Sequence, residues 1–185
     1  MGFGSPTNPD GLDFEAELLP FIGDLYRMAR WLTRDQERAE ELVHDAVILG
    51  MKGFHTYRAT SSLKSWMFTI IYRLNIRQNQ KKKLPIADVP DETLINQLAY
   101  EPDIPKHLTD EEIIAALERL PVSLSELVML VNVEGFTYAD AAKILQIPIG
   151  TVMSRLYRAR QRLRVDLEDA ALNAGFLERA GEVTP

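Results

Sequence analysis

The amino-acid sequence predicts an all-α protein in which two small helical domains are joined by a flexible acidic linker. No alternating pattern typical of a β-strand persists anywhere, and apolar residues recur at helical spacing. Four prolines interrupt residues 84–108, where acidic residues also gather. The chain has 185 residues, of which 46% are hydrophobic, so both domains can bury a core.

These signals divide the chain into five parts. We expect a disordered N-terminus over 1–11, a helical bundle over 12–83, the linker over 84–108, a helix-turn-helix domain over 109–168 and a C-terminal tail over 169–185. One short helical turn is expected inside the linker, near residues 94–98. The two ends are polar and carry no helical pattern, which favours disorder there.

A helix over residues 37–54 is the first long element of the expected bundle. Thr33 and Gln36 match a capping box, which places the start of the helix after Leu32. Its apolar residues keep helical spacing and predict one buried face, formed by Ala39, Leu42, Val43, Ala46 and Leu49. The opposite face is acidic and polar.

A second helix of the bundle is expected over residues 63–83. A polar break precedes it, in which Ser61 or Ser62 is a plausible N-cap. Its apolar stripe consists of Leu63, Met67, Ile70, Ile71 and Leu74. Trp66 and Arg73 lie along one shoulder of that stripe, so this helix offers an aromatic ring and a guanidinium group together.

The C-terminal domain contains four expected helices separated by caps and breaks. Thr109 with Glu112 caps the first helix, and Pro121 breaks the chain after it. Ser123 with Glu126 starts the second helix, which Gly135 ends. Thr137 caps the third helix, over 138–146. After the turn QIPIG, Thr151 opens the fourth helix. The last two helices match a helix-turn-helix pattern.

The fourth helix concentrates positive charge. Five arginines fall within the last ten positions of residues 150–164. The helix buries one stripe, formed by Val152, Leu156, Ala159 and Leu163, and leaves its other faces polar. Its N-terminal amides can face a phosphate, while Ser154, Arg155 and Arg158 can reach base edges in a major groove.

Charge is segregated along the chain although the formal net charge is −6. Residues 61–83 carry +6, residues 84–126 carry −8 and residues 127–165 carry +4. Two basic blocks separated by an acidic spacer indicate two contacts with a polyanion.

Other classes of function find no support in the sequence. The chain has no cysteine, and its three histidines show no metal-ligand spacing, so we expect no metal. It has no phosphate-binding glycine loop and no nucleophile–base pair, so we expect neither an enzyme nor a cofactor. Because it has no signal peptide and no apolar run of membrane-spanning length, we expect a cytoplasmic protein without membrane insertion.

Three stretches resemble the extracytoplasmic-function (ECF) class of bacterial RNA polymerase sigma factors. They are RAEELVHDAV at 38–47, SSLKSWMFTIIYRLNIRQ at 61–78 and LPVSLSELVMLVNVEGFTYADAAKILQIPIGTVMSRLYRARQRLR at 120–164. The resemblance implies a sigma-two domain over 12–83 and a sigma-four domain over 109–168. It also implies a protein that binds core RNA polymerase, recognises two promoter elements, promotes strand opening and is controlled by an anti-sigma factor.

The resemblance implies three contact surfaces. The clamp helices of the largest polymerase subunit would bind Glu40, Glu41, Leu42, His44 and Asp45, and the polymerase flap would contact the sigma-four domain. The minus-ten element would bind Phe54, Tyr57, Ser61, Lys64, Trp66, Arg73 and Arg77. The minus-thirty-five element would bind Thr151, Met153, Ser154, Arg155, Tyr157, Arg158 and Arg162.

Three residues depart from the pattern of that class. Met153 stands where the class usually has a lysine or arginine, which removes one contact with DNA. Val47 and Met51 replace aromatic residues that are common in the polymerase-binding helix. We therefore expect an unusual promoter preference and a repacked polymerase interface.

Two alternatives remain open from the sequence. A stand-alone helix-turn-helix regulator would use residues 120–168 alone and would leave the helix with Trp66 and Arg73 unexplained. A sigma-like mimic that sequesters an anti-sigma factor would have no need of basic residues such as Arg155, Arg158 and Lys64.

Overall fold

The computed structural model of the chain describes residues 6–58, 62–79 and 110–173. Within these ranges the ordered elements are helices, and the only strand-like feature is an isolated bridge between Thr7 and Asp13. The expected linker over 84–108, with its turn near 94–98, lies outside the described residues, as do Ser61 and Thr109. Contacts divide the chain into two units, Met1–Asp88 with Glu134–Ile147, and Val89–Val133 with Pro148–Pro185.

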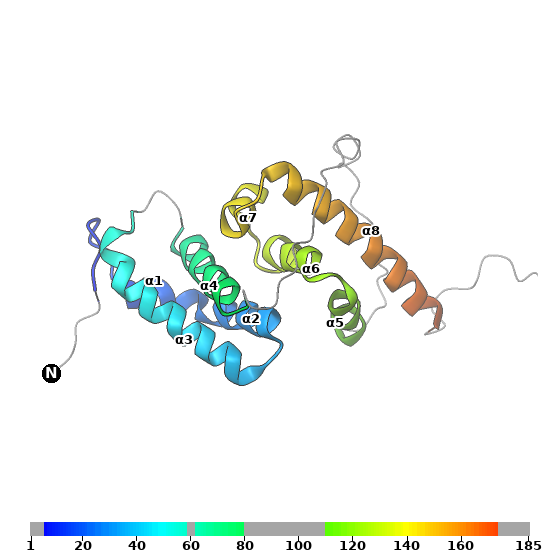
Figure 1. The fold of residues 1–185 in the computed structure, drawn as a ribbon, viewed down its shortest axis with the longest axis horizontal. Coiled ribbons are helices and arrows are strands. Elements are labelled where there is room, and N and C mark those ends of the chain that lie inside the picture. Colours follow the sequence, from blue (N-terminus) through cyan, green and yellow to red (C-terminus); the bar gives the residue numbers. More distant parts are fainter. Residues whose placement is uncertain (1–5, 59–61, 80–109, 174–185) are drawn as a thin grey trace, which may run out of the picture. The chain divides into compact units, whose positions relative to one another are not determined.

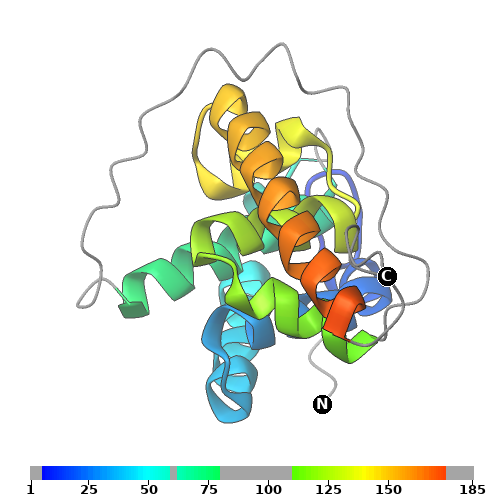
Figure 2. The same cartoon turned by 90° about the vertical axis from the view of Figure 1, so that its right-hand side faces the viewer.

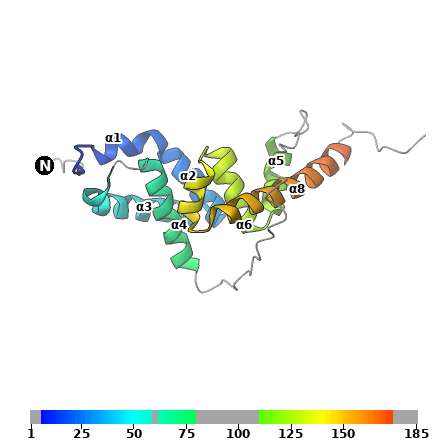
Figure 3. The ribbon, with the colours of Figure 1, turned by 90° about the horizontal axis from the view of Figure 1, so that it is seen from above.

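The first unit contains five α-helices and two short 3-10 turns among its described residues. They are α1 (Phe14–Leu18), η1 (Leu19–Phe21), α2 (Ile22–Thr33), α3 (Gln36–Gly53), η2 (Phe54–Thr56), α4 (Leu63–Asn79) and α7 (Tyr138–Leu145). Helix α3 contacts both α2 and α4, as Figures 1 and 3 show. The helices predicted over 37–54 and 63–83 correspond to α3 and α4. The sequence analysis placed α1 and α2 only within a bundle, without bounds.

The core of the first unit is apolar and rich in aromatic rings. Its fully buried side chains include Phe14, Leu25, Met28, Leu42, Phe54, Met67, Phe68 and Ile71. Leu63, Met67 and Ile71 confirm the predicted stripe of α4, with Ile70 and Leu74 half-buried at its margins. On α3 the predicted stripe ends early, because Leu49 is 41% exposed.

Residues 6–11 fold against this unit, although the sequence analysis expected disorder over 1–11. The side chain of Asn8 is the centre of this turn, and the residue is only 5% exposed. Its Oδ1 accepts from the backbone N–H of Leu12 at 2.8 Å, and its Nδ2 donates to the carbonyl of Tyr57 at 3.4 Å. The side chain of Asn8 is thus held by one backbone group four residues away and by another 49 residues away.

The predicted capping box at Thr33 is wrong, because the break between α2 and α3 comes later. Arg34 has φ 54°, which ends α2 in the left-handed conformation. Thr33 still belongs to α2 and its hydroxyl donates to the carbonyl of Ala29 at 2.9 Å. Asp35 is the N-cap of α3, and its carboxylate accepts from the backbone N–H of Arg38 at 2.9 Å.

The start of α4 agrees with one of the two predicted caps. The hydroxyl of Ser62 accepts from the backbone N–H of Ser65 at 3.1 Å. Ser62 therefore satisfies an amide of the first helical turn that would otherwise have no partner.

The second unit is formed by four elements among its described residues. They are α5 (Asp110–Arg119), α6 (Val122–Val128), the π-helical turn η4 (Met129–Val133) and α8 (Ile149–Asn173). Figure 2 shows α8 crossing α6 and α5, and both pairs of helices are in contact. Val152, Leu156 and Ala159 are buried on α8 as predicted, whereas Leu163 is half-buried.

Two predicted helix starts in the C-terminal part shift by one or two residues. Helix α6 begins at Val122, because the carbonyl of Pro121 accepts from Leu124 and Ser125, and Ser123 is not the cap. Helix α8 begins at Ile149, and the carbonyl of Pro148 accepts from the N–H of Thr151 at 2.9 Å. Proline just before a helix fixes φ near about −65° and has no N–H that would need a partner.

Thr137 caps α7 as predicted. Its hydroxyl accepts from the backbone N–H of Asp140 at 3.1 Å and donates to the Asp140 carboxylate at 2.7 Å. Gln146, with φ 57°, ends α7 in the left-handed conformation. Gly135, with φ +74°, occupies the break before α7, where a residue with a Cβ is disfavoured.

Candidate nucleic-acid and polymerase interfaces

Helix α8 carries the basic side chains predicted to contact DNA. Arg162 and Arg164 are exposed, and Arg155, Arg158 and Arg160 are half-buried. Because Val152, Leu156 and Ala159 are buried, the arginines between them are directed to the remaining faces of the helix. The resulting surface is strongly positive over about three helical turns.

The other predicted contacts on α8 differ in accessibility. Thr151, Met153 and Tyr157 are half-buried, which leaves part of each side chain accessible. Ser154 is only 8% exposed, and its hydroxyl donates to the carbonyl of Thr151 at 3.1 Å. A buried hydroxyl that is already bonded to the backbone does not reach a base edge, so the structure disfavours the predicted DNA contact of Ser154.

Helix α4 carries a second basic surface. Arg73 and Arg77 are exposed and lie four residues apart, hence on one face of the helix. No acidic residue occurs between Leu63 and Asn79, so nothing on this helix neutralises the two arginines. Trp66 is half-buried near the start of α4.

An aromatic cluster lies beneath the start of α4. Phe14 meets Phe54 edge to face at a centroid distance of 5.1 Å, Phe54 stacks on Tyr57 at 5.6 Å, and Tyr57 lies 5.4 Å from Trp66. Phe54 is fully buried and Tyr57 is 6% exposed. Burial raises the pKa of the Tyr57 hydroxyl, and the nearby charges of Glu17 and Asp10 raise it further.

Burial changes the interpretation of this cluster. The sequence analysis assigned Phe54 and Tyr57 to contacts with the minus-ten element. Phe54 instead fills the core, and Tyr57 stacks on it. Trp66 is the member of the cluster that is half-buried rather than buried, which leaves part of its surface accessible.

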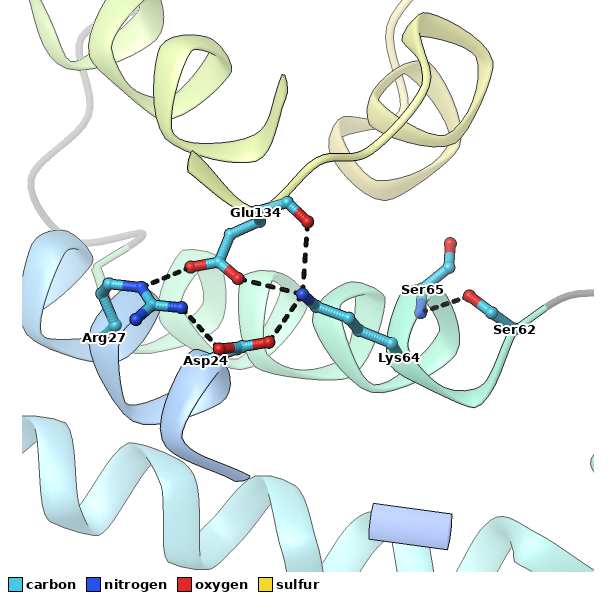
Figure 4. A network of polar contacts seen from close by, with 6 residues as sticks. All are labelled: Asp24, Arg27, Ser62, Lys64, Ser65 and Glu134. Atoms are coloured by element: carbon cyan, nitrogen blue, oxygen red, sulfur yellow. Dashed lines mark hydrogen bonds and ion pairs between the residues drawn. The ribbon is translucent and has the colours of Figure 1, made fainter. Parts of the chain in front are cut away.

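Lys64 lies in a four-residue ion network (Figure 4). Its Nζ is 2.7 Å from Oδ2 of Asp24 and 3.1 Å from Oε2 of Glu134, and it donates to the carbonyl of Glu134 at 3.2 Å. Arg27 closes the network, with its Nε 2.7 Å from Oε1 of Glu134 and its Nη2 bonded to Asp24. The predicted minus-ten contact of Lys64 is thus already engaged with two carboxylates.

The network perturbs the ionisation of two of its members. Burial by itself raises the pKa of Asp24, but hydrogen bonds and charges from Lys64 and Arg27 outweigh it and hold that pKa below its ordinary value. The hydrogen bond to Glu134 raises the pKa of Arg27, and Asp24 acts in the same direction. Asp24 is therefore ionised and Arg27 protonated at neutral pH.

Comparisons with known proteins identify the family of this chain. The family model of sigma-70 region 2 matches residues 20–84, and that of sigma-70 region 4 matches residues 110–163. The ECF RNA polymerase sigma factor EcfG of Rhodopseudomonas palustris is 32% identical over 147 residues, which cover 80% of this chain and 81% of that protein. The chain belongs to the ECF family of RNA polymerase sigma factors.

Further relatives of this ECF sigma factor extend the similarity to other bacteria and to solved structures. The ECF sigma factor SigM of Mycobacterium tuberculosis is 31% identical over 75% of this chain and 69% of that protein. The sigma factor RpoE of Bartonella quintana, solved in complex with the anti-sigma factor NepR, has a TM-score of 0.60 and 31% identity, and the match covers 84% of this chain and 96% of that one. CnrH, solved with the cytosolic domain of CnrY, has the same fold, with a TM-score of 0.57 at 18% identity.

The family membership confirms the predicted fold class of two helical domains and the predicted class of function. Sigma factors are not enzymes. Among the described residues of this ECF sigma factor, no helix is both long and apolar enough to cross a lipid bilayer.

Helix α3 of the ECF sigma factor presents an acidic surface. Glu40, Glu41, His44 and Asp45 are exposed, in agreement with accessible positions for a partner. Leu42 is fully buried and faces the core, so its predicted contact with the polymerase is not supported by its position. Leu49 and Met51, which are 41% and 43% exposed, add apolar surface near the end of the same helix.

The sequence analysis missed Asp24, Arg27 and Glu134. The spacing within α2 gives one clue, because Asp24 and Arg27 lie three residues apart and can pair on one helix face. Glu134 is 107 residues from Arg27 in the sequence, and no local pattern indicates that pair.

Proposed function

We propose that this ECF sigma factor binds core RNA polymerase, recognises the minus-thirty-five and minus-ten promoter elements, and promotes strand opening at the start of transcription. One observation carries the proposal. The chain matches sigma-70 regions 2 and 4 in that order, and each matched region contains a helix with exposed arginines. A stand-alone regulator needs only the second of these helices.

The minus-thirty-five element is assigned to α8. Arg155 and Arg158 have the position and chemistry to read base edges, and the exposed Arg162 is suited to a phosphate. Thr151, Met153 and Tyr157 complete the surface with part-accessible side chains. Met153 offers no charge, so one contact made by lysine or arginine in related proteins is absent here.

The minus-ten element is assigned to α4 and the start of that helix. Trp66 supplies a ring on which an unstacked base can stack, while Arg73 and Arg77 neutralise backbone phosphates. Binding unpaired bases more tightly than paired ones shifts the promoter toward the open state without any chemical step. Phe54 and Tyr57 support Trp66 from beneath rather than contacting the base.

The polymerase contact is assigned to the acidic surface of α3. Glu40, Glu41, His44 and Asp45 offer charge complementary to a basic partner, and Leu49 and Met51 offer an adjacent apolar area. We assign this surface to the clamp helices of the largest polymerase subunit, and the sigma-four domain to the flap.

Regulation is assigned to a separate anti-sigma factor. The solved relatives RpoE and CnrH are each bound to another protein, which is an anti-sigma factor in the case of RpoE. We propose that a protein of this kind also covers the polymerase- and DNA-binding surfaces of this chain. The protein acts where the polymerase acts, in the cytoplasm.

In vitro transcription tests the proposal. Core RNA polymerase is incubated with the purified chain and a pool of genomic promoter fragments, and the transcripts are sequenced. We expect start sites that share two spaced elements and that require the chain. Arg30→Ala, which removes an exposed cation on α2 outside the three surfaces, serves as the control and should retain full activity.

Two results would contradict the proposal. If the chain fails to associate with core polymerase, the sigma assignment is wrong. If it binds promoter duplex alone and drives no transcription, the stand-alone regulator is the better description.

A further inference from the structure

Residues 6–13 form a closed turn ahead of α1. The backbone N–H of Asn8 donates to the carbonyl of Leu12 at 3.1 Å, and that of Gly11 donates to the carbonyl of Asn8 at 3.0 Å. Gly11 has φ +80°, a conformation that a residue with a Cβ rarely adopts. The turn is thus closed by its own backbone, and α1 follows it directly.

The side-chain amide of Asn8 bonds both within this turn and outside it. Its Oδ1 accepts from the N–H of Leu12 at 2.8 Å and from that of Asp10 at 3.2 Å. Its Nδ2 donates to the Asp10 carboxylate at 3.3 Å and to the carbonyl of Tyr57 at 3.4 Å. The oxygen of the amide therefore stabilises the turn, and the nitrogen joins the turn to Tyr57.

Tyr57 is the residue at which the chain leaves η2 in an extended conformation. Its N–H donates to the carbonyl of Phe54 at 3.0 Å and its carbonyl accepts from Asn8, so both of its backbone polar groups have partners. Its ring stacks on Phe54 and lies 5.4 Å from the ring of Trp66. Figures 1 and 3 show the turn beside the end of α3, from which η2 continues.

Asp10 of the same turn also acts on Tyr57. Burial is the main cause of the raised pKa of the Tyr57 hydroxyl, and the charge of Asp10 adds to it. The turn therefore lies near both the backbone and the phenol of Tyr57.

We propose that Asn8 is a positioning residue for the minus-ten surface, because its Nδ2 holds the backbone of Tyr57 and thereby the ring against which Trp66 lies. This inference rests on the proposed assignment of Trp66 to the minus-ten strand. A ring that is held in place before the base arrives loses little conformational entropy when the base stacks on it, and such preorganisation raises affinity. Asn8 acts in this way without contacting DNA.

The variant Asn8→Asp separates the two roles of the side chain. Aspartate keeps an oxygen that accepts from Leu12 but has no N–H to donate to the carbonyl of Tyr57. The probe is a labelled single-stranded oligonucleotide with the non-template minus-ten sequence of a promoter found by in vitro transcription, and fluorescence anisotropy measures its binding to the holoenzyme. We expect Asn8→Asp to weaken this binding by about fivefold, the usual effect of losing one hydrogen bond. Binding of a minus-thirty-five duplex should be unchanged.

Two further variants control for the charge that Asn8→Asp introduces. Asp10→Asn removes a carboxylate beside Asn8 and leaves the bond from Asn8 to Tyr57, so it should bind the single strand with the wild-type affinity. The double variant Asn8→Asp/Asp10→Asn has no second carboxylate beside the new one, and it should bind as weakly as Asn8→Asp alone. If the double variant regained the wild-type affinity, charge repulsion and not the lost bond to Tyr57 would explain the effect, and the inference would be wrong.

Fluorescence of the free chain gives a second measurement that does not need polymerase. The chain has two tryptophans, so Trp31→Phe leaves Trp66 as the only one. In that background we expect acrylamide to quench Trp66 more strongly in Asn8→Asp than in the parent protein, because the ring is less firmly held. Equal quenching in the two proteins would refute the inference.

The outcomes separate this inference from the proposed function. Transcription by the wild-type holoenzyme tests the sigma assignment by itself. If that transcription is normal and the Asn8→Asp variant, shown to be folded by circular dichroism, binds the single strand as tightly as the wild type, Asn8 does not position the minus-ten surface. If the variant loses duplex and single-strand binding equally, the change is a general loss of structure, and the inference is refuted as well.

Discussion

Gly50 of α3 lies close to side chains from both α1 and α4. A Cβ built at this position would lie 2.7 Å from Sδ of Met67 and 3.0 Å from Cζ of Phe14. Both side chains are fully buried or nearly so, and neither has open space to move into. The absence of a side chain at residue 50 therefore sets the spacing of the core beneath the minus-ten surface.

We expect Gly50→Val to lower the free energy of unfolding by about 1–3 kcal/mol, the usual cost of overpacking a core. Urea denaturation monitored by circular dichroism measures the change. Gly23→Val, in α2, introduces the same side chain where nothing lies within 4 Å, and serves as the control. Equal losses in both variants would mean that helix propensity, not packing, explains the effect.

Asp24 makes stability depend on pH in the acidic range. Its pKa in the folded protein lies below the ordinary value of 3.8, so the folded state favours its ionised form. The resulting stabilisation is complete above about pH 4 and is lost as the pH falls through the lowered pKa. We expect Asp24→Asn to be less stable than the wild type at pH 7, with the difference shrinking below pH 4. Urea denaturation of both proteins at pH 7 and below pH 4 measures the difference in their free energies of unfolding. The same difference at both pH values would contradict the prediction.

At the scale of single elements, the cap of α7 has a measurable effect. Thr137→Ala removes the hydroxyl that accepts from the N–H of Asp140, and we expect a loss of about 1 kcal/mol in the free energy of unfolding. Thr151→Ala is the matched control, because Thr151 is the third residue of α8 and not its N-cap. Thermal denaturation compares the two, and an equal loss would show that the cap is not what stabilises α7.

The caps also show where sequence patterns suffice. At Ser62 and Thr137 the cap and the amide that it satisfies are close in sequence, so spacing alone predicts them. At Thr33 the same pattern fails, because Arg34 adopts the left-handed conformation and moves the helix start to Asp35. Thr33 and Asp35 are both possible N-caps of α3. The φ angle of Arg34 decides between them, and the residue type of Arg34 does not specify that angle.

Burial explains the remaining differences within elements. Helical periodicity predicts the buried residues of α4 and α8, since their apolar residues recur on one face. It does not predict that Phe54 lies in the core, because that depends on contact with Phe14, 40 residues earlier in the chain. The same limit applies to Leu42 and Ser154, whose burial removes them from the predicted interfaces.

For the whole molecule, the two basic helices should give separable defects. We expect Arg158→Ala to weaken binding to minus-thirty-five duplex by about 1–3 kcal/mol and to relax base preference at one position. Arg73→Ala should leave that duplex affinity unchanged and reduce open-complex formation, because α4 is assigned to the melted strand. Filter binding and permanganate footprinting with the holoenzyme measure the two steps. If either variant lost both duplex binding and open-complex formation, the assignment of α8 to the duplex and of α4 to the melted strand would be contradicted.

The site as a whole could be predicted only in part from sequence. The basic surfaces of α4 and α8 follow from local composition, and the acidic face of α3 follows from helical spacing. The network of Asp24, Arg27, Lys64 and Glu134 joins three distant parts of the chain, so it can be identified only in the folded structure. Ion pairs between residues far apart in the sequence produce no local or periodic pattern from which they could be predicted.

The turn around Asn8 has a practical consequence for anyone shortening or tagging this protein. Asn8 bonds to the carbonyl of Tyr57, six residues before α4 begins. A truncated version beginning at Leu12 would keep every long helix but would lose the hydrogen bond from Asn8 to Tyr57. Affinity tags placed close to the start of the chain would strain the same anchor, so fusion partners belong at the far end or behind a generous spacer.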